Sequence, residues 1–115
     1  MEDIVYVESQ DLKILADQLR EKYFLHLGHV DLDAIYFVEK VGDEPKKIKV
    51  IEILGVTNGG IRQMLQQVGR NQSYCLQVWQ DAWNALNPYT QQWLMFEVLY
   101  SIKRGNGGYL KKPDI

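Results

Sequence analysis

One long helix is predicted by the stretch NPYTQQWLMFEVLYSIKRG, residues 87–105. Asn87 can accept hydrogen bonds from the free amides at a helix start. Pro88 suits the first helical position because the amide hydrogen that it lacks would be unpaired there. At the other end, Lys103 and Arg104 favour the carbonyl end of the helix dipole, and Gly105 can adopt the positive φ that often ends a helix.

The middle of this helix is apolar on nearly every side. Between Trp93 and Ile102 the only polar groups are Glu97, Ser101 and the hydroxyl of Tyr100. A helix that is apolar all round is typical of a protein interior. We therefore expect a central, buried helix near the C-terminus, with a carboxylate in its middle.

The composition is that of one soluble globular domain spanning residues 1–115. Hydrophobic residues make up 46% and charged residues 24%, which excludes a disordered chain. The net charge of −2 and the pI of about 5.6 argue against a nucleic-acid-binding protein. The one cysteine, Cys75, excludes an internal disulfide and suits a reducing compartment. No apolar run reaches membrane-spanning length and the N-terminus is acidic, so we expect a cytoplasmic protein.

The rest of the chain predicts an α+β fold, in which helices pack on one face of a small, mainly antiparallel sheet of about three strands. Residues 4–7 alternate as an edge strand or an extended lead-in would. Helical spacing predicts helices over 11–23, 61–68 and 82–86, and alternation predicts strands over 33–41, 47–56 and 72–79. The first two of these three strands flank a polar turn and are predicted to form a hairpin. The tail, residues 105–115, has the composition of a loop and is expected to be mobile.

A family resemblance rests on Phe96-Glu97-Val98-Leu99-Tyr100, which occupies the place of the zincin motif His-Glu-x-x-His. In that motif two histidines four residues apart bind zinc, and the glutamate activates the metal's water. From about Leu12 to Tyr100 the chain resembles the small putative metallopeptidases encoded by phages and prophages. The shared layout is an N-terminal helix, an aromatic strand, a second strand ending in Leu-Gly, a third strand and a Trp-containing segment. The aromatic strand corresponds to residues 34–37 and the strand ending in Leu-Gly to residues 53–55. The third strand corresponds to residues 76–78 and the Trp-containing segment to residues 82–86.

The resemblance implies a zincin-like fold that has lost its metal site. Phe96 and Tyr100 stand at both histidine positions, and neither phenyl nor neutral phenol is a usual zinc ligand. We therefore expect a non-catalytic protein without a cofactor. Its suspected phage origin implies an accessory protein that binds a host protein, such as an anti-CRISPR or other anti-defence inhibitor. One alternative is a zinc peptidase with a site rebuilt from Glu97, His26 or His29, and Asp114. Another is a structural or assembly subunit.

Glu97 has several readings. It could be the surviving general base of a zincin, or it could bind a basic group from a partner. The structural reading is a carboxylate that pairs with Arg62, Arg70 or Arg104, or one that reaches solvent at the helix edge. Phe96 and Tyr100 could likewise be ordinary core aromatics.

Aromatic residues near the long helix are the candidate partner contacts, because exposed aromatics commonly mark interfaces. They are Trp83, Tyr89 and Tyr109, with Arg104 and Lys111 as a charged rim. Trp79 is a weaker candidate, since its strand could turn it inward.

The two histidines, His26 and His29, lie in a connector over residues 25–30 that we expect to be solvated, and they form at most a weak metal site. Cys75 falls in a predicted strand, where a buried and inert thiol is expected. The sequence gives no indication of the oligomeric state.

Overall fold

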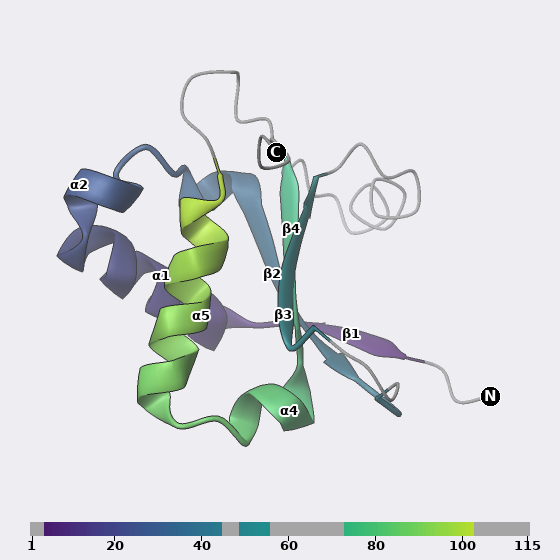
Figure 1. Ribbon diagram of the computed structural model, residues 1–115. Coiled ribbons are helices and arrows are strands. Elements are labelled where there is room, and N and C mark those ends of the chain that lie inside the picture. The colour runs from purple at the N-terminus through teal and green to yellow at the C-terminus, as the bar shows by residue number, and fades with distance from the viewer. Residues whose placement is uncertain (1–3, 45–48, 56–72, 103–115) are drawn as a thin grey trace, which may run out of the picture.

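The computed structural model describes residues 4–44, 49–55 and 73–102, and in these it shows a four-stranded mixed sheet packed with helices (Figure 1). The predicted α+β class is therefore confirmed. The elements in chain order are β1 (Val5–Glu8), α1 (Gln10–Lys22), α2 (Phe24–Leu27), a short 3-10 helix η1 (Leu32–Ala34), β2 (Ile35–Val41), β3 (Ile51–Gly55), β4 (Tyr74–Trp79), α4 (Gln80–Asn84) and α5 (Pro88–Tyr100).

The strands follow the order β1-β2-β4-β3 across the sheet. β1 is antiparallel to β2, β4 is antiparallel to β3, and β2 runs parallel to β4, with Ile35 opposite Tyr74. The predicted hairpin between β2 and β3 is wrong, because β4 lies between them. All six residues of β4 are buried, and a strand that is buried throughout belongs in the centre of a sheet. Alternation of apolar residues identified the strands but could not identify their partners.

β1 forms one edge of the sheet, so the N-terminal run is an edge strand and not only an extended lead-in. Its four residues are exposed. Ser9 follows directly, and its hydroxyl oxygen accepts a hydrogen bond from the amide of Leu12 at 3.2 Å, which caps α1.

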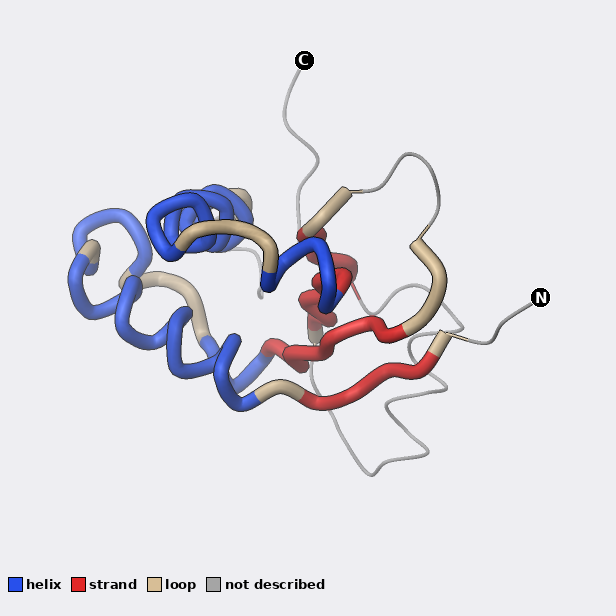
Figure 2. Tube along the Cα trace, turned by 90° about the horizontal axis from the view of Figure 1, so that it is seen from below, coloured by secondary structure: helices blue, strands red, loops and turns tan. Residues whose placement is uncertain are grey.

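The helices α1, α2 and α5 lie together on one side of the sheet (Figures 1 and 2). The main core fills the space between this helical layer and the sheet. α1 contributes Leu12, Ala16 and Leu19, as its predicted helical face requires. The largest fully buried apolar side chains are Leu27, Val30, Val38, Leu76, Val78, Met95 and Leu99.

The opposite face of β2, β4 and β3 carries a second small cluster around Val38 and Cys75. On the same face Lys40, opposite Trp79 in the register, is buried. The ammonium of Lys40 lies 4.6 Å from the centre of the Trp79 ring and 3.8 Å from a carboxylate oxygen of Glu52. A buried cation is thus satisfied jointly by an aromatic face and a carboxylate.

The predicted connector over residues 25–30 is partly wrong, because it begins within α2 and is anchored in the core. Leu27 and Val30 are fully buried. Arg20 donates from Nε to the carbonyl of Val30 at 2.7 Å and from Nη2 to that of Gly28 at 2.8 Å. A β-carbon at Gly28 would lie 2.6 Å from the carbonyl oxygen of Phe24, so only glycine fits there.

Two sequence predictions, the short helix over 61–68 and the mobile tail over 105–115, lie outside the described residues. Among the helices that are described, none is both long enough and apolar enough to cross a lipid bilayer.

Candidate functional site

The helix α5 begins as its sequence predicts but has two distinct faces. The side-chain oxygen of Asn87 accepts a hydrogen bond from the amide of Thr90 at 2.8 Å, and Pro88 occupies the first turn. The helix ends at Tyr100, before the Lys103–Gly105 signal, which lies outside the described residues. Met95 and Leu99 are fully buried against the core.

The expectation of a helix buried on every side is wrong. Trp93 is 56% exposed and Tyr100 is 57% exposed, so the outer face of α5 is aromatic and open to solvent. α5 covers one face of the sheet as part of an outer layer and does not cross the interior (Figure 1). Apolar composition predicted burial here, but these aromatic rings pack on one another.

The two residues at the positions of the zincin histidines lie side by side on this outer face. The rings of Phe96 and Tyr100 stack with their centres 5.7 Å apart and 13° between their planes. Trp93 continues the stack, with its ring centre 6.4 Å from that of Phe96 and an interplanar angle of 19°. Phe96 also packs against the main core, so the reading as core aromatics holds for Phe96 but not for Tyr100.

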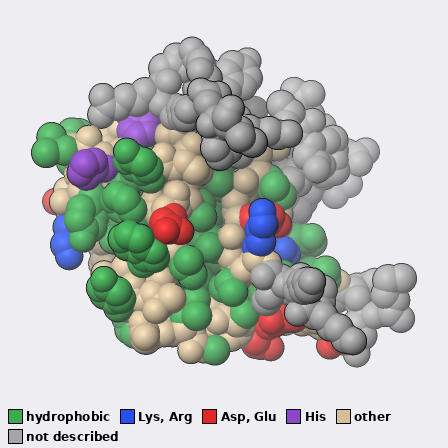
Figure 3. Space-filling view, viewed as in Figure 1, with side chains coloured by type: hydrophobic (Ala, Val, Ile, Leu, Met, Phe, Trp, Pro, Cys, Tyr) green, Lys and Arg blue, Asp and Glu red, His purple; other side chains and the backbone are tan. Residues whose placement is uncertain are grey.

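Residues from α2 and the end of α1 complete this group. Tyr23 meets Phe96 edge-on with ring centres 5.2 Å apart. The ring of His26 lies 6.4 Å from that of Phe96 and 6.2 Å from that of Tyr100, again edge-on. We call Tyr23, His26, Trp93, Phe96 and Tyr100 the aromatic cluster. Figure 3 shows hydrophobic side chains gathered over α5 and α2, with an acidic side chain among them and histidines at their margin.

A small apolar hollow of about 170 Å³ opens beside the aromatic cluster, between α1 and α5. It is lined by Leu19, Tyr23, Tyr89, Gln92, Trp93 and Phe96. Its size matches one or two apolar side chains more nearly than a drug-sized ligand.

Glu97 is exposed on α5, so it is not a carboxylate within the core as we expected. It lies one turn after Trp93 and nearly one turn before Tyr100, and neighbours at this spacing share a helix surface. No described residue forms an ion pair or hydrogen bond with its carboxylate. Of its structural readings, the carboxylate that reaches solvent at the helix edge is the one observed. Arg62, Arg70 and Arg104 lie outside the described residues.

The two histidines differ in their surroundings. His26 is exposed and belongs to the aromatic cluster. His29 is half-buried, and its Nε2 lies 2.6 Å from the carbonyl oxygen of Ile102. Because a carbonyl oxygen only accepts, Nε2 carries the proton in this contact, and Nδ1 is buried without a described partner. The expectation that both histidines are solvated is therefore wrong for His29.

The described residues offer no set of ligands for the alternative metal sites. Within residues 4–44, 49–55 and 73–102 there is no group of three or more His, Cys, Asp or Glu side chains that could hold a metal ion. Asp114, proposed for a rebuilt site, lies outside those ranges.

The remaining candidate partner contacts have mixed outcomes. Tyr89 is 78% exposed and lines the hollow. Trp83 is only 5% exposed and its carbonyl accepts a hydrogen bond from Gln91, so its assignment as a partner contact is wrong. Trp83 belongs to the main core, and its helix α4 packs against β2 and β4. Trp79 is buried, as its strand position suggested. Tyr109, Arg104 and Lys111 lie outside the described residues.

Cys75 is a fully buried free thiol in β4, as expected. Burial raises the pKa of its thiol, and the hydrogen bond from Gln77 opposes that rise only in part. A thiol that stays protonated is a poor nucleophile and a poor metal ligand, so Cys75 has no place in a reactive site.

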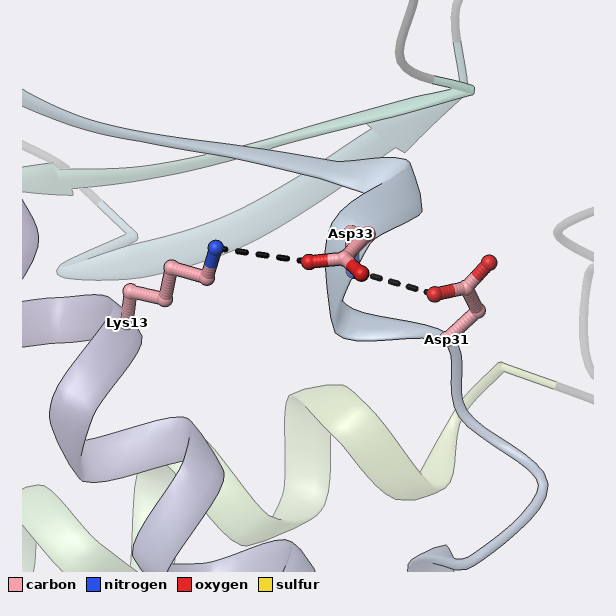
Figure 4. Close-up of polar contacts among 3 residues, drawn as sticks. All are labelled: Lys13, Asp31 and Asp33. Atoms are coloured by element: carbon pink, nitrogen blue, oxygen red, sulfur yellow. Dashed lines mark hydrogen bonds and ion pairs between the residues drawn. The ribbon is translucent and has the colours of Figure 1, made fainter.

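A polar group on another part of the surface consists of Lys13, Asp31 and Asp33 (Figure 4). Lys13 lies 3.4 Å from a carboxylate oxygen of Asp33, and Asp31 accepts a hydrogen bond from the amide of Asp33 at 3.0 Å. These side chains are exposed, and that of Asp31 caps η1. Surface ion pairs of this kind contribute little to folding stability, and we assign these residues no functional role.

Sequence reasoning missed Tyr23 and His26 as members of the aromatic cluster. Tyr23 ends the predicted helix over residues 11–23, and nothing local reveals that its ring meets α5. The spacing of Trp93, Phe96 and Tyr100, three and four residues apart, places them on one helix face. That spacing was the available signal for an exposed aromatic face.

Comparison with known proteins gives one match. The family model described as "Putative phage metallopeptidase" matches residues 4–115. No curated protein and no solved structure matches the chain.

Proposed function

The chain belongs to the putative phage metallopeptidase family, and from this premise we propose that it is a non-catalytic member that acts by binding a protein of the host cell. The aromatic cluster is the proposed contact surface. The zincin-like fold, the loss of catalysis and the cytoplasmic location are parts of the same proposal. An anti-defence role, including inhibition of a CRISPR system, follows from the family's phage origin and from no residue.

One observation carries this proposal: stacked rings occupy both positions at which the resemblance expects zinc ligands. Phe96 has no donor atom, and the neutral phenol of Tyr100 is not a usual zinc ligand. A zincin glutamate works on a water that the metal has activated. Without that water, Glu97 has no substrate for general-base chemistry.

The exposure of the aromatic cluster supports a binding role. Large exposed aromatic side chains are costly for a protein that acts alone, and they are enriched at the centres of protein interfaces. Trp93 and Tyr100 are more than half exposed, and the hollow beside Trp93 adds a concave feature. The hollow matches one or two apolar side chains of a partner in size.

The experiment compares binding variants on the outer face of α5 with a matched control. The tagged protein captures its partner from host lysate, and the partner's affinity is then measured with purified proteins. Trp93→Ala and Tyr100→Ala should each weaken binding by about 2 kcal/mol if they are hot spots. Ile14→Ala is the control, because Ile14 is 54% exposed but lies on α1 outside the aromatic cluster.

Three outcomes would contradict the proposal. Equal affinity of the Trp93→Ala, Tyr100→Ala and Ile14→Ala variants would remove the aromatic cluster as the contact surface. Zinc-dependent peptide hydrolysis that Glu97→Gln abolishes would restore the peptidase reading. Capture of virion components in place of a host protein would favour the assembly-subunit reading.

A further inference from the structure

We propose that the aromatic cluster takes an arginine side chain of the partner, whose guanidinium pairs with Glu97 and stacks on Trp93, while a neighbouring apolar side chain fills the hollow. This inference deepens the proposed function and rests on it for the identity of the partner as a host protein. The assignment of the arginine itself rests on the charges and rings of α5.

The position of Glu97 is the first argument. Trp93 precedes it by four residues and Tyr100 follows it by three, so all three lie on one strip of the helix. A partner that covers both rings must also cover the carboxylate between them. A carboxylate removed from water without a counter-charge is strongly unfavourable. A cation of the partner would satisfy this carboxylate most strongly.

The protein itself provides the second argument on the opposite face of its sheet. There the ammonium of Lys40 lies over the ring of Trp79 and 3.8 Å from Glu52. Trp93 and Glu97 supply the same ring and carboxylate on α5, but no described residue supplies the cation. The component that no described residue supplies is a basic side chain, and we assign it to the partner.

Arginine fits this place better than lysine. Its planar guanidinium can lie flat on an indole while its donors engage a carboxylate, and it is less strongly hydrated than an ammonium ion. Arginine is also enriched among interface hot spots. The hollow lined by Leu19, Tyr23 and Tyr89 adjoins Trp93, so an apolar residue near the arginine completes the fit.

The test uses four short probes, the acetylated and amidated tripeptides Leu-Ala-Arg, Leu-Ala-Lys, Leu-Ala-citrulline and Leu-Ala-Glu. Binding to the 115-residue protein is followed by NMR through the indole N–H signal of Trp93, which a Trp93→Phe variant identifies. Leu-Ala-Arg should give saturable shifts, and citrulline, which keeps the shape without the charge, should bind about tenfold more weakly. Leu-Ala-Lys should lie between the two.

Variants at Glu97 sharpen the test. Glu97→Gln should weaken Leu-Ala-Arg binding by about tenfold, and Glu97→Lys should abolish it and admit Leu-Ala-Glu instead. Glu97 is exposed, and an unchanged unfolding transition shows that each variant is folded. The inference would be overturned if all four probes bound equally. It would also be overturned if substitution of Glu97 left the affinity for Leu-Ala-Arg unchanged. Lysine binding as tight as arginine would overturn the choice of arginine.

Failure of this inference is distinguishable from failure of the proposed function. If the captured host protein is lost with Trp93→Ala but retained at full affinity with Glu97→Lys, partner binding stands and the arginine assignment falls. If Leu-Ala-Arg binds through Glu97 while no host protein depends on Trp93, the arginine site stands and the proposed function falls.

Discussion

The imidazole of His29 donates a hydrogen bond from Nε2 to the carbonyl oxygen of Ile102 at 2.6 Å, and so joins the connector after α2 to the end of α5. Ile102 is buried, and its own amide bonds back to Leu99. The carbonyl groups at a helix end have no partner within the helix. His29 therefore supplies a partner at the point where α5 leaves the core.

Replacement of His29 by alanine should lower the free energy of unfolding by about 1–3 kcal/mol, because a half-buried carbonyl loses its hydrogen-bond partner. Denaturant unfolding measures this change. His26→Ala is the control, since His26 is exposed and contacts only ring edges; it should cost less than about 1 kcal/mol. Equal losses in the two variants would show that the contact with Ile102 is unimportant.

The two faces of α5 should respond differently to truncation. Leu99→Ala should lower the free energy of unfolding by about 2–5 kcal/mol, because it opens a cavity in the core. Tyr100→Ala, at the next residue, should cost about 1 kcal/mol or less, because the side chain is more than half exposed. Matched urea titrations of both variants give the comparison. A larger loss for Tyr100→Ala would mean that the ring stack stabilises the fold.

Placing histidines at positions 96 and 100 should create a zinc site. Three imidazoles on one tetrahedral zinc, with bonds of about 2 Å, have ring centres roughly 5 Å apart. The rings of His26, Phe96 and Tyr100 already lie 5.7, 6.2 and 6.4 Å apart. Phe96→His/Tyr100→His should therefore bind Zn²⁺ stoichiometrically, with His26 as the third ligand.

Isothermal titration with zinc, and the visible spectrum of the cobalt-substituted protein, measure this gain. Adding His26→Ala to the double variant should weaken zinc binding by at least about tenfold, the loss of one of three ligands. If the unmodified protein binds zinc as tightly as the double variant, the two introduced histidines are not the zinc ligands.

The stability of the protein should fall in alkaline solution. Burial raises the pKa of Cys75, so the folded protein keeps the thiol proton while the unfolded chain loses it above about pH 8.5. The stabilisation is complete below that pH and is lost as the pH rises through the folded pKa. Burial also raises the pKa of Tyr74, which extends the decline above about pH 10.

The free energy of unfolding, measured from pH 7 to pH 10.5, tests this decline. Cys75→Ala is less stable at every pH, because a buried atom is removed, but its curve should be flatter between pH 8.5 and pH 10. The native thiol should also react slowly with iodoacetamide at pH 7.5. Identical slopes for the two proteins would contradict a role for the thiol.

The sequence predicted what depends on neighbouring residues. Asn87 caps the helix that follows it, and the apolar positions of α1 face the core as their spacing requires. The run that became β4 was recognised because its residues favour strands. These are local properties, and they are confirmed.

The sequence could not predict what depends on distant partners. Nothing local to β4 specifies that it separates β2 from β3, since strand pairing is decided by the whole sheet. The exposure of Trp93 was missed because aromatic composition does not reveal whether a ring packs on the core or on other rings. Trp83, judged a surface residue, is buried for the same non-local reason.

The central place of β4 also fixes the order in which the protein can assemble during synthesis. β1, β2 and β3 leave the ribosome before β4, yet in the described sheet β3 pairs only with β4. Until Trp79 has emerged, β2 and β3 each carry an open edge, and open edges invite pairing with other chains. α5 follows last, because its inner face needs the finished sheet. A nascent chain halted before β4 is therefore an aggregation-prone species, and the aromatic surface on α5 is made only after the strands of the described sheet.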